Sequence, residues 1–181
     1  MPVPARGAND AVDSIQQAWE RERPGTPADS IGVITRIWRS AKLLSDDRRR
    51  TLARLGIDAA TLDLLSTLRR AGMPYQLTAG ALAELTLVSA GAISQRVARA
   101  EGEGLVVRER SAHDGRVTYV RLTPAGHALI ERAVDDLLRH EDALLSALTP
   151  AQCGELSDLL RLLLASLPGG PHDPASRGAV P

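Results

Sequence analysis

The stretch that decides the fold is SAGAISQRVARAEGEGLVVRER (89–110), which runs directly into SAHDGRVTYVRLTPAG (111–126). Ser89 has the chemistry of a helix N-cap. The residues after it keep a helical spacing until two glycines end it, with the inward positions Ile93, Val97 and Ala100. Two strand-like segments, 105–109 and 117–122, flank the turn sequence His113-Asp114-Gly115. The stretch therefore predicts a helix with a β-hairpin beside it.

Helical patterns lie on both sides of this stretch. Asp58 and Thr78 have N-cap chemistry, and Thr123-Pro124 and Thr149-Pro150 each combine an N-cap with a proline at the first helical position. The spacing of apolar residues predicts helices over 9–23, 31–55, 59–71, 79–85, 90–101, 124–148 and 150–167. The predicted fold is mostly α-helical with a small β-wing.

These elements divide the chain into six segments. We expect a disordered lead (1–8), an extra N-terminal helix and linker (9–30), a dimerisation helix (31–57), a winged helix-turn-helix DNA-binding domain (58–123), further dimerisation helices (124–167) and a disordered tail (168–181). The wide leucine faces of the last two helices exceed what one small winged domain can cover, which favours a homodimer. An ordinary helical hairpin within one chain is the alternative interpretation.

Composition limits the possible functions. The 181 residues carry no formal net charge, but they use 21 Arg and a single Lys, and the middle of the chain is more basic than the C-terminal part. The planar guanidinium of arginine can donate two hydrogen bonds to a phosphate or a base edge, which the ammonium of lysine does less well. No apolar run is long enough to span a membrane, and no signal peptide precedes the first helix, so we expect a soluble cytoplasmic protein.

The helix that begins at Ser89 has the residue types that contact DNA. In a helix-turn-helix, the second helix enters the major groove and presents its early residues to base edges. Gln pairs with adenine, Arg pairs with guanine, and an Arg on a hairpin reaches a minor groove. The predicted DNA-binding residues are Thr78, Ser89, Gly91, Ser94, Gln95, Arg99, His113 and Arg116. A solvated polar face is the alternative interpretation of the helix alone.

The order L-x-x-x-S-x-G-A-I-S-x-R-V-x-R-x-E-x-x-G-L-V-x-R (85–108), then D-G-R (114–116) and L-T-P-A-G (122–126), resembles the MarR family of winged-helix regulators. The resemblance covers about residues 31–167. It implies a homodimer that represses transcription from a pseudo-palindromic double-stranded DNA operator. The wing of this family often has D-R-R where this chain has D-G-R, so one wing contact is in doubt.

A narrower resemblance points to the urate-responsive branch of that family. It implies that Trp19, Asp63, Arg96 and Arg108 bind urate or another small anion and transmit its binding to the DNA-binding domain. An arginine can pair with an anionic oxygen, and a tryptophan can stack on a flat ring. The alternatives are core packing for Trp19, a phosphate contact for Arg96, and a structural ion pair between Asp63 and Arg108.

Other functions have weaker support in the sequence. The four histidines are not clustered, and no nucleophile–base pair or phosphate-binding loop appears, so we expect neither a metal site, nor a cofactor, nor an enzyme. Two alternatives stay open: a winged-helix module that binds another protein, and a redox sensor that acts through Cys153, the single cysteine.

Overall fold

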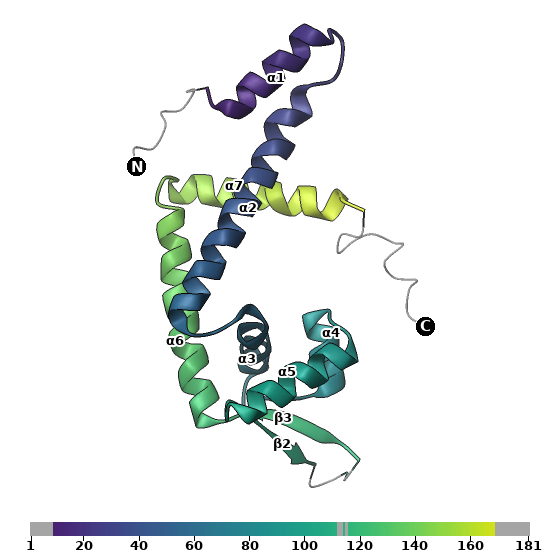
Figure 1. Cartoon of the computed structure of the whole chain (residues 1–181), viewed down its shortest axis with the longest axis vertical. Coiled ribbons are helices and arrows are strands. Elements are labelled where there is room, and N and C mark those ends of the chain that lie inside the picture. The colour runs from purple at the N-terminus through teal and green to yellow at the C-terminus, as the bar shows by residue number, and fades with distance from the viewer. Residues whose placement is uncertain (1–8, 112–113, 115, 169–181) are drawn as a thin grey trace. The chain divides into compact units, whose positions relative to one another are not determined.

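A computed structural model describes residues 9–111, 114 and 116–168 of the chain. Its described helices and strands follow the order α1, α2, α3, β1, α4, α5, β2, β3, α6, α7 (Figure 1). Among these residues, no helix is both long enough and apolar enough to cross a membrane. The predicted disordered lead, His113 and all but Pro168 of the predicted tail lie outside the described residues.

The first two helices pack against each other near the N-terminus. Helix α1 (Ala11–Glu22) begins with a capping box between Asp10 and Asp13, and α2 (Asp29–Leu55) ends at Gly56 in the left-handed conformation. Arg36 of α2 joins them, because its guanidinium donates to Asp10 at 3.0 Å and to Asp13 at 2.8 Å. Val12 is buried at this contact.

Three further helices form the centre of the winged domain. Asp58 caps α3 (Ala59–Arg70), Thr78 caps α4 (Ala79–Thr86) and Ser89 caps α5 (Ala90–Gly102). In each case the side-chain oxygen accepts a hydrogen bond from a backbone N–H of the first helical turn, which satisfies a donor that the helix leaves unpaired. All three predicted caps are present, because capping depends on residues that are close in sequence.

A three-stranded antiparallel sheet completes the winged domain, in the order β1–β3–β2. Strands β2 (Val106–Arg110) and β3 (Thr118–Leu122) form the predicted hairpin, with Arg108 opposite Val120. The third strand, β1 (Gln76–Thr78), was not predicted. It pairs Leu77 with Val120, so a short segment before α4 is fixed by a partner more than forty residues away.

One continuous core joins these elements. It contains Leu52 from the end of α2, leucines of α3, Leu82 of α4, Ile93 and Val97 of α5, Val120 and Leu122 of the sheet, and Ile130, Ala133 and Leu137 of α6 (Pro124–Leu144). Leu64, Leu65 and Leu68 are fully buried. The core therefore holds α3, α5 and the sheet as one body beneath the surface that α5 presents.

The start of α6 is fixed tightly to the end of α5. The Thr123 hydroxyl donates to the carbonyl oxygen of Gly104 at 2.7 Å, and the Thr123 N–H donates to that of Leu105 at 3.1 Å. Gly126 faces the same Leu105 carbonyl so closely that a Cβ built there would overlap with its oxygen. We call these four residues, Gly104, Leu105, Thr123 and Gly126, the α5–α6 joint.

The chain divides into two compact units, with the boundary within α6. The second unit contains the last turns of α6 and all of α7 (Pro150–Ser166), which begins with the predicted capping box between Thr149 and Gln152. No residue of α7 is buried. Its exposed large apolar residues are Leu156, Leu159, Leu160, Leu162 and Leu164.

The predicted fold class is confirmed: the chain is mostly helical with a small antiparallel wing, and the winged helix-turn-helix is present. The helix boundaries agree to within two residues, except that α6 ends at Leu144 and a turn follows to Leu148.

Candidate nucleic-acid interface

The exposed face of α5 carries the residues that the sequence predicted at DNA. Ile93, Val97 and Ala100 are buried against the core, so the helix is held by one side. The opposite side leaves Ser89, Gly91, Ser94, Gln95 and Arg99 exposed. No heavy atom lies within 4 Å of a Cβ built at Gly91, so the backbone there is open to a close approach.

The first helix of the motif meets α5 at a sharp turn. Leu87 ends α4 in the left-handed conformation with φ 54°, and its N–H reaches back to the carbonyl oxygens of Ala83 and Glu84. Thr78 is half-buried, and its hydroxyl oxygen is used by the N–H of Ala81 at 3.2 Å. Thr78 therefore positions α4 as its N-cap, and its hydroxyl can still donate a hydrogen bond.

The wing presents arginines from a hydrogen-bonded turn. The carboxylate of Asp114 accepts from the backbone N–H of Arg116 at 2.9 Å, which is an Asx-type turn, and the carbonyl oxygen of Asp114 accepts from Val117 at 2.9 Å. Arg116 is exposed. Asp114 therefore fixes the backbone of Arg116 and shapes the turn.

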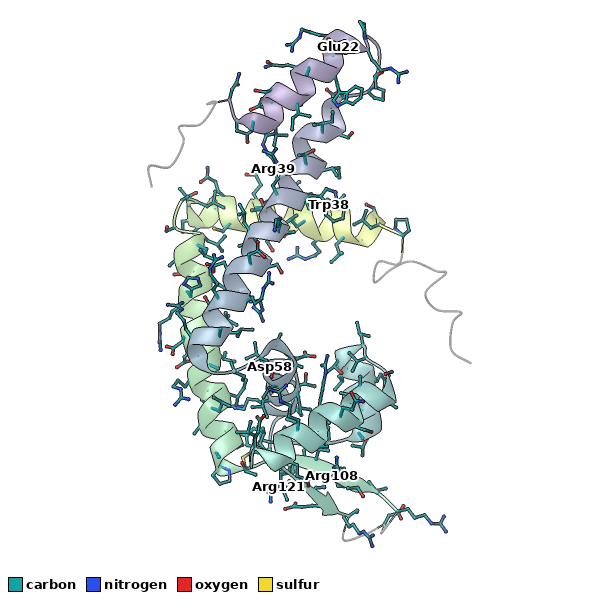
Figure 2. The ribbon with its side chains drawn as sticks, viewed as in Figure 1. Glu22, Trp38, Arg39, Asp58, Arg108 and Arg121 are labelled. Carbon is teal, nitrogen blue, oxygen red and sulfur yellow. The ribbon has the colours of Figure 1, made fainter. Side chains whose placement is uncertain are left out.

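The body of the wing carries further charge. Arg121, labelled in Figure 2, lies on β3 and forms a diagonal ion pair with Glu109 of β2, with Nε 2.9 Å from Oε2. The Arg121 guanidinium holds the pKa of Glu109 below its ordinary value. Arg110, which lies opposite Thr118, is exposed and was not singled out from the sequence.

Arg99 is held by two carboxylates of its own chain. Its Nη2 lies 2.8 Å from Oδ2 of Asp58, the cap of α3, and its Nε lies 3.1 Å from Oε1 of Glu103. The Arg99 side chain is still 62% exposed, so the pairing leaves it within reach of solvent. The sequence does not reveal this arrangement, because the N-cap role of Asp58 depends on its neighbours alone, whereas its pairing with Arg99 joins two helices.

Two of the four predicted ligand residues come together. Arg96 Nη1 lies 2.8 Å from Asp63 Oδ2, and the Arg96 side chain is only 25% exposed. This pair joins α5 to α3, and the Asp63 side chain is 43% exposed. Arg96 therefore lies on the side of α5 that faces α3.

The other two predicted ligand residues have different surroundings. Arg108 pairs with Glu101 at the end of α5, at 3.5 Å between Nη1 and Oε2. Trp19 lies half-exposed on α1, which packs along the first half of α2. The α2 helix runs on for roughly 28 Å between Arg36 and Leu55, at 1.5 Å per residue, before α3 begins. Within one chain, the structure therefore brings neither Trp19 nor Arg108 to the Asp63–Arg96 pair.

Two hollows adjoin Arg99. The larger, of about 720 Å³, has an apolar floor that includes Leu52, Ile57 and Leu129, and a charged rim that includes Asp58 and Arg99. The smaller, of about 260 Å³, is lined by Ala60, Thr61, Ala92, Gln95, Arg96 and Arg99. Arg96 thus borders a shallow hollow whose volume is below the 300–1,000 Å³ typical of drug-sized ligands.

Neither a metal site nor a disulfide emerges from the described part of the chain. No group of three or more His, Cys, Asp or Glu side chains there is arranged to hold a metal ion. Cys153 is a free, partly buried thiol on α7. The exposed polar and arginine side chains of α5 and of the wing lie where a winged-helix protein presents residues to DNA, and they define the class of the protein.

Comparison with known proteins agrees with this class. The model of the MarR family matches residues 55–117. The HTH-type transcriptional regulator PecS of Dickeya dadantii is 28% identical over 149 residues, which cover 82% of this chain and 90% of PecS. An uncharacterised HTH-type transcriptional regulator of Bacillus cereus is 34% identical over 93 residues, 51% of this chain and 58% of that protein.

The crystal structure of apo MarR from E. coli has the same fold. It superimposes with a TM-score of 0.60 at 26% identity, over 72% of this chain and 96% of that one. The chain is similar to MarR-family regulators, and these similarities support a winged-helix transcriptional regulator that binds DNA. The named relatives are transcriptional regulators, which is consistent with a protein that is not an enzyme.

Proposed function

We propose that the chain is a homodimeric repressor that binds a pseudo-palindromic operator and is released from it by a small anion. The observation that carries the proposal is the exposed face of α5, with Gly91, Ser94 and Gln95, next to a wing that presents Arg116. A helix with small and amide side chains at its start suits the major groove, and the wing arginine suits the adjacent minor groove.

Unburied apolar surface supports the homodimer. Trp38 of α2 is 72% exposed, and α7 exposes a row of leucines, although side chains of these kinds are rarely left in water together. We propose that a second copy of the chain covers these apolar residues. Two copies related by a two-fold axis would present two α5 helices to half-sites about one helical turn apart.

The Asp63–Arg96 pair supports release by an anion. Of the two arginines predicted to bind the ligand, Arg96 is more buried than Arg108. Arg96 also borders the smaller hollow beside α5. An anion that takes the Nη1 donor of Arg96 displaces Asp63, and this exchange alters how α5 is tied to α3. Such a ligand shifts the balance only by its different affinity for the free and DNA-bound arrangements.

A salt-dependent binding experiment tests the DNA proposal. The unmodified protein selects duplexes from a random pool, and affinity for the enriched duplex is measured by fluorescence anisotropy at several salt concentrations. We expect a linear fall of log affinity with log salt, because phosphate contacts release counterions. If no duplex is enriched, the proposed function is wrong.

A separate experiment tests the ligand. Urate is added to the protein–duplex complex of the unmodified protein and of Asp63→Asn and Arg96→Gln variants. Release from the unmodified protein, blunted in both variants, supports the site. If urate leaves the unmodified complex intact, urate is excluded as the ligand while DNA binding stands.

A further inference from the structure

The arrangement around Arg99 has a consequence for DNA affinity. We infer that Asp58 and Glu103 compete with DNA phosphate for the guanidinium of Arg99, so that this set of three residues, the Arg99 clamp, limits how tightly the protein binds DNA. The inference rests on the proposed DNA-binding function and adds a control on affinity within the chain itself.

The position of Arg99 favours a phosphate as its DNA partner. Arg99 lies one turn after Gln95 on the exposed face of α5, about 14 Å along the helix from Ala90 at 1.5 Å per residue. The early residues of a recognition helix reach base edges, and the sugar-phosphate backbone takes half or more of all protein–DNA hydrogen bonds. An arginine near the end of this helix therefore faces the backbone of the duplex.

Asp58 is a fixed acceptor whether or not Arg99 is present. Its Oδ1 accepts from the backbone N–H of Thr61 at 2.9 Å, and its Oδ2 accepts from the Thr61 hydroxyl at 3.2 Å. The Thr61 N–H first, and then the charge of Arg99, hold the pKa of Asp58 below its ordinary value. Because the cap already orders this carboxylate, pairing with Arg99 costs Asp58 little conformational freedom.

The clamp is weak enough for DNA to open. The side chains of Arg99, Glu103 and Asp58 are 62%, 45% and 39% exposed, and ion pairs that water reaches in this way contribute little. Glu103 also follows Arg99 by four residues, which is the less favourable order for a helical ion pair. DNA can therefore take Arg99, but Asp58 and Glu103 are then left as unpaired negative charges beside the phosphates.

A double-mutant cycle tests the inference on the enriched duplex. Asp58→Asn removes the charge and keeps the cap, since Asn caps a helix as well as Asp does. We expect it to tighten binding about threefold, the order of one exposed ion pair. It should also steepen the slope of log affinity against log salt by about one. In the unmodified protein, the Asp58 carboxylate takes up a cation from solution when Arg99 leaves it for DNA, and the amide of the Asp58→Asn variant would not. Arg99→Ala should weaken binding and abolish both effects of Asp58→Asn.

Two comparisons separate the clamp from simpler explanations. If Asp58→Asn tightens binding equally in the Arg99→Ala background, the effect is general charge repulsion and the inference is overturned. It is also overturned if Asp58→Asn leaves the affinity unchanged while the unmodified protein binds the duplex. Failure of the unmodified protein to select any duplex overturns the proposed function instead, and the inference with it.

Controls within the same residues complete the design. Glu103→Gln should tighten binding in the same direction as Asp58→Asn, and only when Arg99 is present. Asp58→Glu restores the charge and should bring the affinity back toward that of the unmodified protein. Urea denaturation should show a loss of stability for Asp58→Ala, which removes the cap, and a much smaller loss for Asp58→Asn.

Discussion

Two glycines in helices illustrate how much single residues depend on their surroundings. Gly91 on α5 and Gly126 on α6 are both helical, and glycine costs a helix interior roughly 0.5–1 kcal/mol relative to alanine. A Cβ at Gly91 would meet nothing within 4 Å, whereas a Cβ at Gly126 would overlap with the carbonyl oxygen of Leu105. The same substitution is therefore expected to have opposite effects on stability at the two positions.

Gly126→Ala should destabilise the protein. The added methyl group has backbone rather than a flexible side chain in its way, and forced overpacking costs roughly 1–3 kcal/mol. The free energy of unfolding, from urea denaturation, measures the effect. If Gly126→Ala is as stable as the unmodified protein, Gly126 and the Leu105 carbonyl do not pack as closely as the structure shows.

Gly91→Ala should stabilise the protein and weaken its binding to DNA. Helix propensity favours alanine by about 0.5–1 kcal/mol, and the new methyl group projects from the exposed face of α5. Denaturation and anisotropy on one preparation separate the two effects. A variant that is more stable and binds DNA equally well would argue against a close approach of this backbone to the duplex.

At the scale of elements, sequence reasoning succeeded where the signal is local. The caps at Asp58, Thr78 and Ser89 and the hairpin around Asp114 follow from neighbouring residues. Strand β1 was missed because three residues, Gln76–Thr78, carry no pattern and depend on β3. The Arg99–Asp58 and Arg96–Asp63 pairs were likewise beyond local reasoning, since each joins two helices that only the tertiary fold brings together.

The contact between α1 and α2 should be sensitive to acid. Arg36 lowers the pKa of Asp10 below its ordinary value of 3.8, and the Asp10 N–H followed by Arg36 does the same for Asp13. A lowered folded-state pKa gives stabilisation that is fully present above the ordinary pKa and is lost as the pH falls through the folded value. The α1–α2 contact should therefore hold at neutral pH and weaken below about pH 4.

The indole N–H resonances of the two tryptophans measure this effect. Trp19 of α1 should shift on acidification before Trp38 of α2 does, which gives an internal reference. Arg36→Gln should produce the shifted Trp19 resonance already at neutral pH, whereas Arg39→Gln, which removes the same charge from the same helix, should not (Figure 2). Identical pH profiles for all three proteins would contradict the role of Arg36.

At the scale of the whole molecule, the proposed dimer depends on apolar residues that one chain leaves exposed. Leu159 of α7 is 58% exposed, so Leu159→Glu should not disturb the fold of one chain. We expect it to give a monomer by sedimentation and to weaken DNA binding on the order of a hundredfold, because linked half-sites gain effective concentration. Met73→Glu, at a residue that is 84% exposed, is the control and should remain a dimer. A dimeric Leu159→Glu variant would exclude this face.

The α5–α6 joint has a mechanical consequence. The β2–β3 hairpin separates α5 and α6 in sequence, but Thr123 is hydrogen-bonded to Gly104 and Leu105, and Gly126 lies directly against the same backbone. A torque applied to α6 would therefore reach the C-terminal end of α5 with little slack. We therefore expect α6 to act on α5 as a lever whose pivot is the Leu105 carbonyl, and the absence of a methyl group at residue 126 sets how closely the two segments meet.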